Sequence, residues 1–212
     1  SIVGSDYPKL EVLVVDDCSH DRTPEIIRSF AHDGIRFISG KEPEDTWLAK
    51  NQAYQRLYEE SNGEIILFCG VDVRFEPGSI RALVDTMLQK RKTMLSIVPG
   101  NKVPKPFSQH DSLLVQPMRY AWEFSLPRRL FNRPPALGTC WITERKIIKE
   151  GGSFAAVSRS INPQSYFARV SAKHDGYSFL RSDNLLAVSS TKDFPEQLAT
   201  AIRKRYPELH RR

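Results

Sequence analysis

Three aspartates that follow apolar runs are the residues of this chain best suited to polar chemistry. Asp16 and Asp17 come directly after the apolar residues 12–15, and Asp72 follows a second apolar run within 64–68. A carboxylate at a strand end that faces a crevice can accept a hydrogen bond from a uracil N–H or a ribose hydroxyl, or hold a divalent cation. These residue types indicate a site for a nucleotide, a metal ion or both.

Lys50 adds a positively charged group to this hypothetical nucleotide site. Near the start of an expected helix, it can pair with a phosphate group. A metal between a carboxylate and a diphosphate would neutralise charge on a departing nucleotide. The alternative is ordinary structure, since Asp often closes turns after strands and Lys often lies on a solvated helix face. Both interpretations stay open at this point.

An alternation of short strands and helices positions these residues. Strands are expected at 11–15, 35–38, 64–68, 94–98, 137–142, 177–180 and 185–188, and helices at 23–31, 46–60, 77–88, 112–124, 162–174 and 193–205, with a short one ending at 151. Such an alternation predicts an α/β domain with a largely parallel sheet. Ligands bind beyond the carboxyl ends of the strands in such sheets, where all three aspartates are expected.

Composition narrows the class of protein. With 212 residues, 40% of them hydrophobic, the chain suits one domain with a core. No run approaches the roughly 18 apolar residues of a membrane span, and we expect no secretory signal. Three widely spaced cysteines fit neither a disulfide framework nor a zinc site and suit a reducing compartment. The net charge of +6 favours anionic partners without choosing among nucleic acid, nucleotide phosphates and a membrane surface.

Several ordered blocks resemble family 2 glycosyltransferases. The family's YPxxEVIVVDDxSxDxT stretch is similar to residues 7–23, its GWxGKxxA stretch to 47–53, and its GExLLFxDADV stretch to 63–73. Residues 95–99 resemble the LSxxP strand of a subgroup that acts on lipid-type or carotenoid-type acceptors, and 138–141 and 151–154 resemble the strand and GGF that precede the acceptor side. The resemblance covers nearly the whole chain in the right order.

The resemblance implies a fold and an activity. The fold would be α/β and GT-A-like, a Rossmann-type sandwich with a mostly parallel central sheet. Residues 1–212 would form a single domain, with 1–99 as the nucleotide-sugar-binding half and 100–212 as the acceptor-side half. The activity would be transfer of a hexose from a nucleotide diphosphate sugar, expected to be a UDP-sugar, to an acceptor hydroxyl on a lipid or glycan, with inversion.

The resemblance also implies residue roles. Asp16 or Asp17 would hold uracil or ribose, with Ser19 and Asp21 shaping the loop. Lys50 would lie near the nucleotide. Asp72 would be the metal-holding aspartate of the DxD motif, with Mg or Mn bound to the diphosphate. An acidic residue further along would take the proton of the acceptor hydroxyl.

The chain departs from the family pattern at the catalytic residues. Gly70 stands where the first aspartate of DxD is expected, and Pro163-Gln164 where the acidic base is expected. Asp175, Glu144 and Glu150 are then the candidates for that base, and each can equally be a surface or cap residue.

Two further departures concern the ends of the chain. The late QxxRW stretch appears at best as residues 202–206. The first strand of the nucleotide-binding half is absent, which predicts an unpaired edge and an exposed apolar stripe. Either the chain is a fragment or another segment fills the gap.

Two rival functions remain open. A catalytically impaired nucleotide-sugar-binding or scaffold protein would explain Gly70 and the missing base. A nucleotidyltransferase would need a Gly-rich phosphate loop near the start, which is not seen.

Aromatic and basic residues within 119–133 predict peripheral membrane contact, or else an aromatic helix packed on the sheet. We expect no nucleic acid partner and a cytoplasmic location, at the inner face of the membrane.

Overall fold

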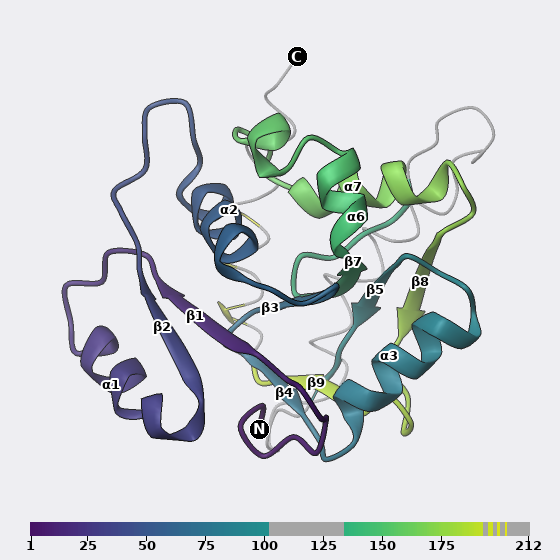
Figure 1. The fold of residues 1–212 in the computed structure, drawn as a ribbon, viewed down its shortest axis with the longest axis horizontal. Coiled ribbons are helices and arrows are strands. Elements are labelled where there is room, and N and C mark those ends of the chain that lie inside the picture. Colours follow the sequence, from purple (N-terminus) through teal and green to yellow (C-terminus); the bar gives the residue numbers. More distant parts are fainter. Residues whose placement is uncertain (102–133, 193–194, 197–198, 200–201, 203–212) are drawn as a thin grey trace.

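The computed structural model describes residues 1–101 and 134–192, and beyond them only 195, 196, 199 and 202 (Figure 1). Its strands are β1 (Val12–Asp16), β2 (Ile35–Ser39), β3 (Ile65–Cys69), β4 (Val73–Phe75), β5 (Met94–Val98), β6 (Gly100–Asn101), β7 (Cys140–Glu144), β8 (Tyr177–Arg181) and β9 (Val188–Ser190). Its α-helices are α1 (Thr23–Ser29), α2 (Ala49–Glu60), α3 (Ser79–Gln89), α6 (Arg145–Glu150) and α7 (Pro163–Ala172), with 3-10 turns at Ala31–Asp33 and Phe154–Val157.

The strands form three hydrogen-bonded groups. β1 pairs with β2 in parallel, β3, β7, β5 and β8 form the central sheet in that order, and β4, β9 and β6 form a small third sheet. The α/β class is confirmed. The central sheet is mixed rather than purely parallel, because β7 begins where β3 ends, with Cys69 opposite Cys140, and so runs antiparallel to β3 and β5. β5 and β8 are parallel.

Alternate residues of the central sheet enter two separate cores. Leu95 and Ile142 point to one face, where they pack with α3 and the β4–β9 pair. Met94 and Trp141 point to the other face, where they pack with α6 and α7. This period of two is what a strand covered on both faces requires. The result is a three-layer sandwich with α3 on one side and α2, α6 and α7 on the other (Figure 1).

β1 and β3 each have one edge without a strand partner among the described residues. β1 pairs with β2 alone, and β3 pairs with β7 alone. The apolar residues Val12–Val15 of β1 are only half-buried, whereas the similar run in β5 is buried. These two apolar strands therefore each have an edge without a strand partner within 1–101 and 134–192.

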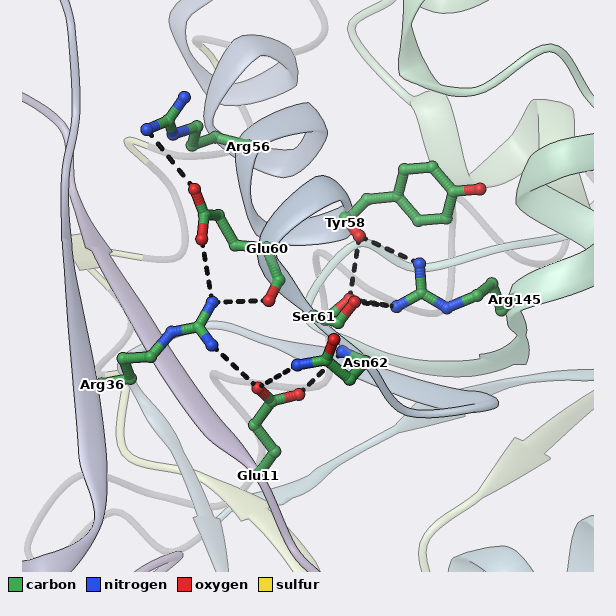
Figure 2. Close-up of polar contacts among 8 residues, drawn as sticks. All are labelled: Glu11, Arg36, Arg56, Tyr58, Glu60, Ser61, Asn62 and Arg145. Atoms are coloured by element: carbon green, nitrogen blue, oxygen red, sulfur yellow. Dashed lines mark hydrogen bonds and ion pairs between the residues drawn. The ribbon is translucent and has the colours of Figure 1, made fainter.

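A polar network joins the β1–β2 pair to the central body (Figure 2). The Glu11 carboxylate, just before β1, accepts hydrogen bonds from the Asn62 N–H at 2.9 Å and from the Asn62 side chain at 3.1 Å. Arg36 of β2 pairs with Glu11 at 3.2 Å and with Glu60 at 3.0 Å. The end of α2 and the starts of β1 and β3 therefore lie together at one edge of the molecule.

Some expectations fall outside the described residues. The helix at 112–124 and the aromatic and basic stretch at 119–133 lie wholly outside, and the helix at 193–205 and the QxxRW-like residues 202–206 lie largely outside. Within the part of the chain that the structure describes, no helix is long and apolar enough to cross a membrane.

Arg145 closes the C-terminal end of α2. Its guanidinium donates to the main-chain carbonyls of Tyr58 at 3.1 Å and of Ser61 (Figure 2). It also donates to the carbonyl of Gly63 at 2.9 Å. These carbonyls belong to the helix end and the turn before β3, which lack helical partners. The planar fork of one arginine thus fixes how α2 turns into the central sheet.

We expect Arg145→Ala to lower the free energy of unfolding by about 2 kcal/mol, because three carbonyls lose a charged donor. Arg145→Lys should recover little of this loss, since one ammonium cannot match the fork. Urea unfolding followed by circular dichroism measures both. Arg56→Ala is the matched control: it removes an exposed pair with Glu60 and should cost at most about 0.5 kcal/mol. A lysine variant as stable as the wild type would contradict this role.

Candidate functional site

The turn after β1 carries the first group of predicted site residues. Asp16 is 7% exposed, and its Oδ2 accepts a hydrogen bond from the Ser19 N–H at 3.2 Å. Its other oxygen, Oδ1, is buried and has no hydrogen-bond partner among the described residues. Cys18 adopts a positive φ of 60° between them. A buried carboxylate oxygen without a partner costs free energy, so it is suited to accept a hydrogen bond from a ligand.

Asp21 shapes the end of the same loop. Its Oδ1 accepts the Thr23 N–H at 2.9 Å, which satisfies one of the free donors at the start of α1. Hydrogen bonds from the side chain and main chain of Thr23 lower the pKa of Asp21. The Ser19 N–H and the Asp21 side chain thus both take part in hydrogen bonds within the turn.

A cavity of about 340 Å³ lies beside this turn. Asp17 and Gly40 line it from the β1–β2 side, and Trp47 and Arg56 line it from the side of α2. Gly40 is required there, since a Cβ at this position would lie 2.1 Å from the Asp16 carbonyl oxygen. The volume is within the range of small-ligand pockets.

A second group of residues meets around Gly138. A Cβ at Gly138 would lie 3.1 Å from Lys50 Nζ and 3.3 Å from Gln164 Oε1, so both side chains converge on the bare glycine. The Gly70 N–H, just past the end of β3, donates to the Thr139 carbonyl at 2.9 Å. Lys50 therefore lies at the carboxyl end of β3, where the sequence predicts a ligand site.

Asn51 holds the start of α2 in this position. It is 1% exposed, and its amide donates to the carbonyls of Val157 and Ser158 at 2.9 Å and of Ser160 at 2.8 Å. The sequence analysis missed Asn51, because its acceptors lie more than 100 residues along the chain.

Gln164 occupies the first turn of α7, where the sequence departs from the acidic pattern. It is 1% exposed, and its Oε1 is without a hydrogen-bond partner among the described residues. An amide cannot take up a proton at neutral pH, so Gln164 is not a general base. Its position beside Lys50 suits it to orient a polar group.

The three candidate bases lie away from these groups. Asp175 follows the C-terminal end of α7, about 15 Å of helix from Gln164, and pairs with Lys92 at 3.0 Å. Glu144 is at the end of β7 opposite Ile65, the first residue of β3, and so at the edge remote from Gly70. Glu150 is exposed at the end of α6. The structure brings none of these carboxylates to the carboxyl end of β3, where Gly70 and Lys50 lie.

Within the DxD-like stretch 63–73, which the structure describes throughout, Asp72 is the single carboxylate close to Gly70. The Ser190 hydroxyl donates to its Oδ2 at 2.8 Å, and Lys192 Nζ lies 3.9 Å from its Oδ1. A Cβ at Gly70 would lie 2.5 Å from Asp72 Oδ1, so a side chain there would force the carboxylate to move. No group of three potential metal-ligating side chains occurs within 1–101 and 134–192.

Comparison with known proteins identifies the class. The family model described as glycosyl transferase family 2 matches residues 1–152. The chain belongs to this family. A curated relative, "Probable glycosyltransferase YdaM" of Bacillus subtilis, is 32% identical over 96 residues, which is 43% of this chain and 23% of the relative.

Solved structures share the fold at low identity. The mannosyltransferase PcManGT from Pyrobaculum calidifontis, in complex with GDP-Man and Mn²⁺, matches with a TM-score of 0.62 and 18% identity over 97% of this chain and 55% of that one. TarS 1–349 of S. aureus in complex with UDP matches with a TM-score of 0.58 and 14% identity over 99% and 60%.

A third solved structure is glucosyl-3-phosphoglycerate synthase from Mycobacterium tuberculosis in complex with Mn²⁺ and UDP-glucose. It matches with a TM-score of 0.55 and 15% identity over 93% of this chain and 66% of that one. These likenesses define a GT-A-like fold. The chain spans about a quarter of the curated relative and about half of the mannosyltransferase.

The three cysteines differ in their expected reactivity. Burial raises the pKa of Cys69 to about 11, with Asp72 adding to the rise, and burial raises the pKa of Cys140 well above its usual range. Partial desolvation, then Asp17, Glu42 and Asp16, raise the pKa of Cys18 more modestly. Only thiolates attack disulfide reagents, so the solvent access and the pKa of each thiol together set the order in which the three cysteines react.

With a chromogenic disulfide reagent at pH 8, we expect Cys18 to react first and the other two thiols to react only as the protein unfolds. Cys18→Ser should remove the fast phase and leave the slow one. A fast phase that survives in Cys18→Ser would contradict the low reactivity expected of the half-buried Cys69 and the buried Cys140.

Proposed function

We propose that this chain transfers a hexose from a UDP-sugar to an acceptor hydroxyl on a lipid or glycan, with inversion at the anomeric carbon. Family membership supports glycosyl transfer. The observation that carries the donor side is the Asp16–Asp17 turn: Asp16 has a buried carboxylate oxygen without a partner among the described residues, and Asp17 next to it lines a cavity. A uracil N–H or a ribose hydroxyl is a donor that such oxygens can bind.

The proposed roles of the site residues follow their order in the sequence. Asp16 or Asp17 binds the nucleoside, with Ser19 and Asp21 holding the turn, and Lys50 pairs with the donor phosphates beside Gly138. Residues 1–99 form the donor half, and 100–212 form the acceptor half. We place the protein in the cytoplasm, in peripheral contact with the inner face of the membrane, where a lipid acceptor is available.

The Mn²⁺ ions in similar structures raise the question of what neutralises the donor phosphates in this chain. Two similar structures contain Mn²⁺, and an ion of that kind would neutralise charge on the leaving nucleotide. In this chain Asp72 would be its protein ligand. The described residues do not fit such a site well, because both Asp72 oxygens already face protein groups and Gly70 supplies none.

We expect UDP, with Mn²⁺ supplied, to raise the melting temperature. At one hundred times the Kd the gain is about 2.7 kcal/mol, or roughly 5–10 °C for a chain of this size. Asp17→Ala should remove most of the shift. Asp85→Ala, which removes an equal charge from the exposed face of α3, should keep it. No shift with UDP or GDP would contradict nucleotide binding.

A second candidate function is nucleotide-sugar binding without turnover, as a scaffold. It is favoured by Gln164, an amide at the start of α7 where the family pattern has an acid. Inverting transfer requires a base within hydrogen-bond reach of the acceptor hydroxyl. Gln164 cannot supply it.

The two candidates differ in nucleotide release. As a transferase, the protein should release UDP from at least one UDP-sugar when lipid extracts are added, and Asp17→Ala should lower the rate at least tenfold. As a scaffold, it should bind UDP and release none across the panel. Gln164→Glu, which restores a carboxylate with little change in shape, should then produce release. Release by the wild type would reject the scaffold.

A further inference from the structure

The last residue of β9 and the two residues after it lie around Asp72. The Ser190 hydroxyl donates to the Asp72 carboxylate at 2.8 Å, and the Thr191 N–H donates to the Asp72 main-chain carbonyl at 3.0 Å. Lys192 Nζ lies 3.9 Å from the second carboxylate oxygen. The Asp72 side chain is 14% exposed and that of Lys192 is 35% exposed. Asp72 is thus enclosed, while the ammonium beside it still reaches solvent.

This arrangement differs from what a divalent cation needs. Mg²⁺ and Mn²⁺ favour octahedral oxygen ligands, with carboxylates free to approach them. Here one Asp72 oxygen is held by Ser190 and the other faces the positive charge of Lys192. A second cation placed on the same carboxylate would repel that ammonium.

Lys192 can neutralise the diphosphate charge that a divalent cation would otherwise neutralise. An ammonium is a compact point charge with three donors, and it pairs readily with phosphate oxygens. Lys50 lies near Gly138, whose neighbour Thr139 bonds the Gly70 N–H. Two ammonium groups from distant segments therefore flank the turn from Gly70 to Asp72, at the end of β3 where ligands bind in α/β sheets.

We propose that Lys192, positioned by Asp72, is the cation that binds the donor diphosphate, so that nucleotide binding does not depend on a divalent metal. The inference rests on the proposed function, because it concerns the phosphates of that donor. Asp72 then acts as a positioning residue: its carboxylate attracts the Lys192 ammonium, which lies 3.9 Å from Oδ1.

The test is UDP and GDP binding measured by calorimetry on the full chain, in EDTA and in 5 mM Mn²⁺. The wild type should bind with Kd values within about twofold in the two conditions. Lys192→Met keeps the length of the side chain without its charge, and should weaken binding at least about tenfold in EDTA. Manganese should restore part of that loss, because Asp72 is then released as a ligand. Lys149→Met, on the exposed end of α6, is the matched control and should bind as the wild type does.

Two results would overturn the role of Lys192 while leaving the proposed function intact: wild-type binding that requires Mn²⁺, or unchanged binding by Lys192→Met in EDTA. Circular dichroism and melting temperature establish that each variant is folded. If neither nucleotide binds to the wild type in either condition, the proposed function fails and the inference fails with it.

Discussion

The pairing of β7 between β3 and β5 is the constraint on which the candidate site depends. Because β7 runs antiparallel to both neighbours, the chain just before it arrives where β3 ends, and the Gly70 N–H bonds the Thr139 carbonyl at 2.9 Å. Trp141 is then fully buried and stacks on Phe68 with ring centroids 4.3 Å apart. The same pairing brings Gly138 to the side chains of Lys50 and Gln164.

The two halves of the site are supported in different ways. The groups around Gly138 rest on the central sheet and on two cores. The Asp16–Asp17 turn rests on a two-stranded sheet that is joined to the body by α2 and by side chains such as Glu11, Arg36 and Asn62 (Figure 2). The Asp16–Asp17 turn, which we propose binds the donor, therefore belongs to the part of the fold with fewer strand contacts.

Much of the fold could be predicted from the sequence, because its signals are local. The run at Met94–Val98 gave β5 with the same bounds, and Pro and Thr marked the start of α1 at Thr23. The antiparallel direction of β7 could not be read from its residues, since an apolar strand buried on both faces looks alike in either direction. The short strands β4 and β6 were missed, as their few residues carry no periodic pattern.

The candidate site was predictable where it follows strand ends and not where distant segments meet. Asp16, Lys50 and Asp72 stand at predicted element ends, as the α/β arrangement requires. Ser190 and Lys192 contact Asp72 from about 120 residues away, and nothing near them in the sequence signals it. Asp175 looked suitable by residue type, but α7 carries it to the far edge of the sheet.

The β1–β2 pair is a sheet of its own among the described residues, which has a consequence for the dynamics expected of the protein. Among residues 1–101 and 134–192, the unit of β1, β2 and α1 shares no sheet hydrogen bonds with the main body. We expect such a unit to open at a lower free energy than the whole domain, as a separate cooperative unit. Its amide protons then exchange with solvent before those of β5 and β7.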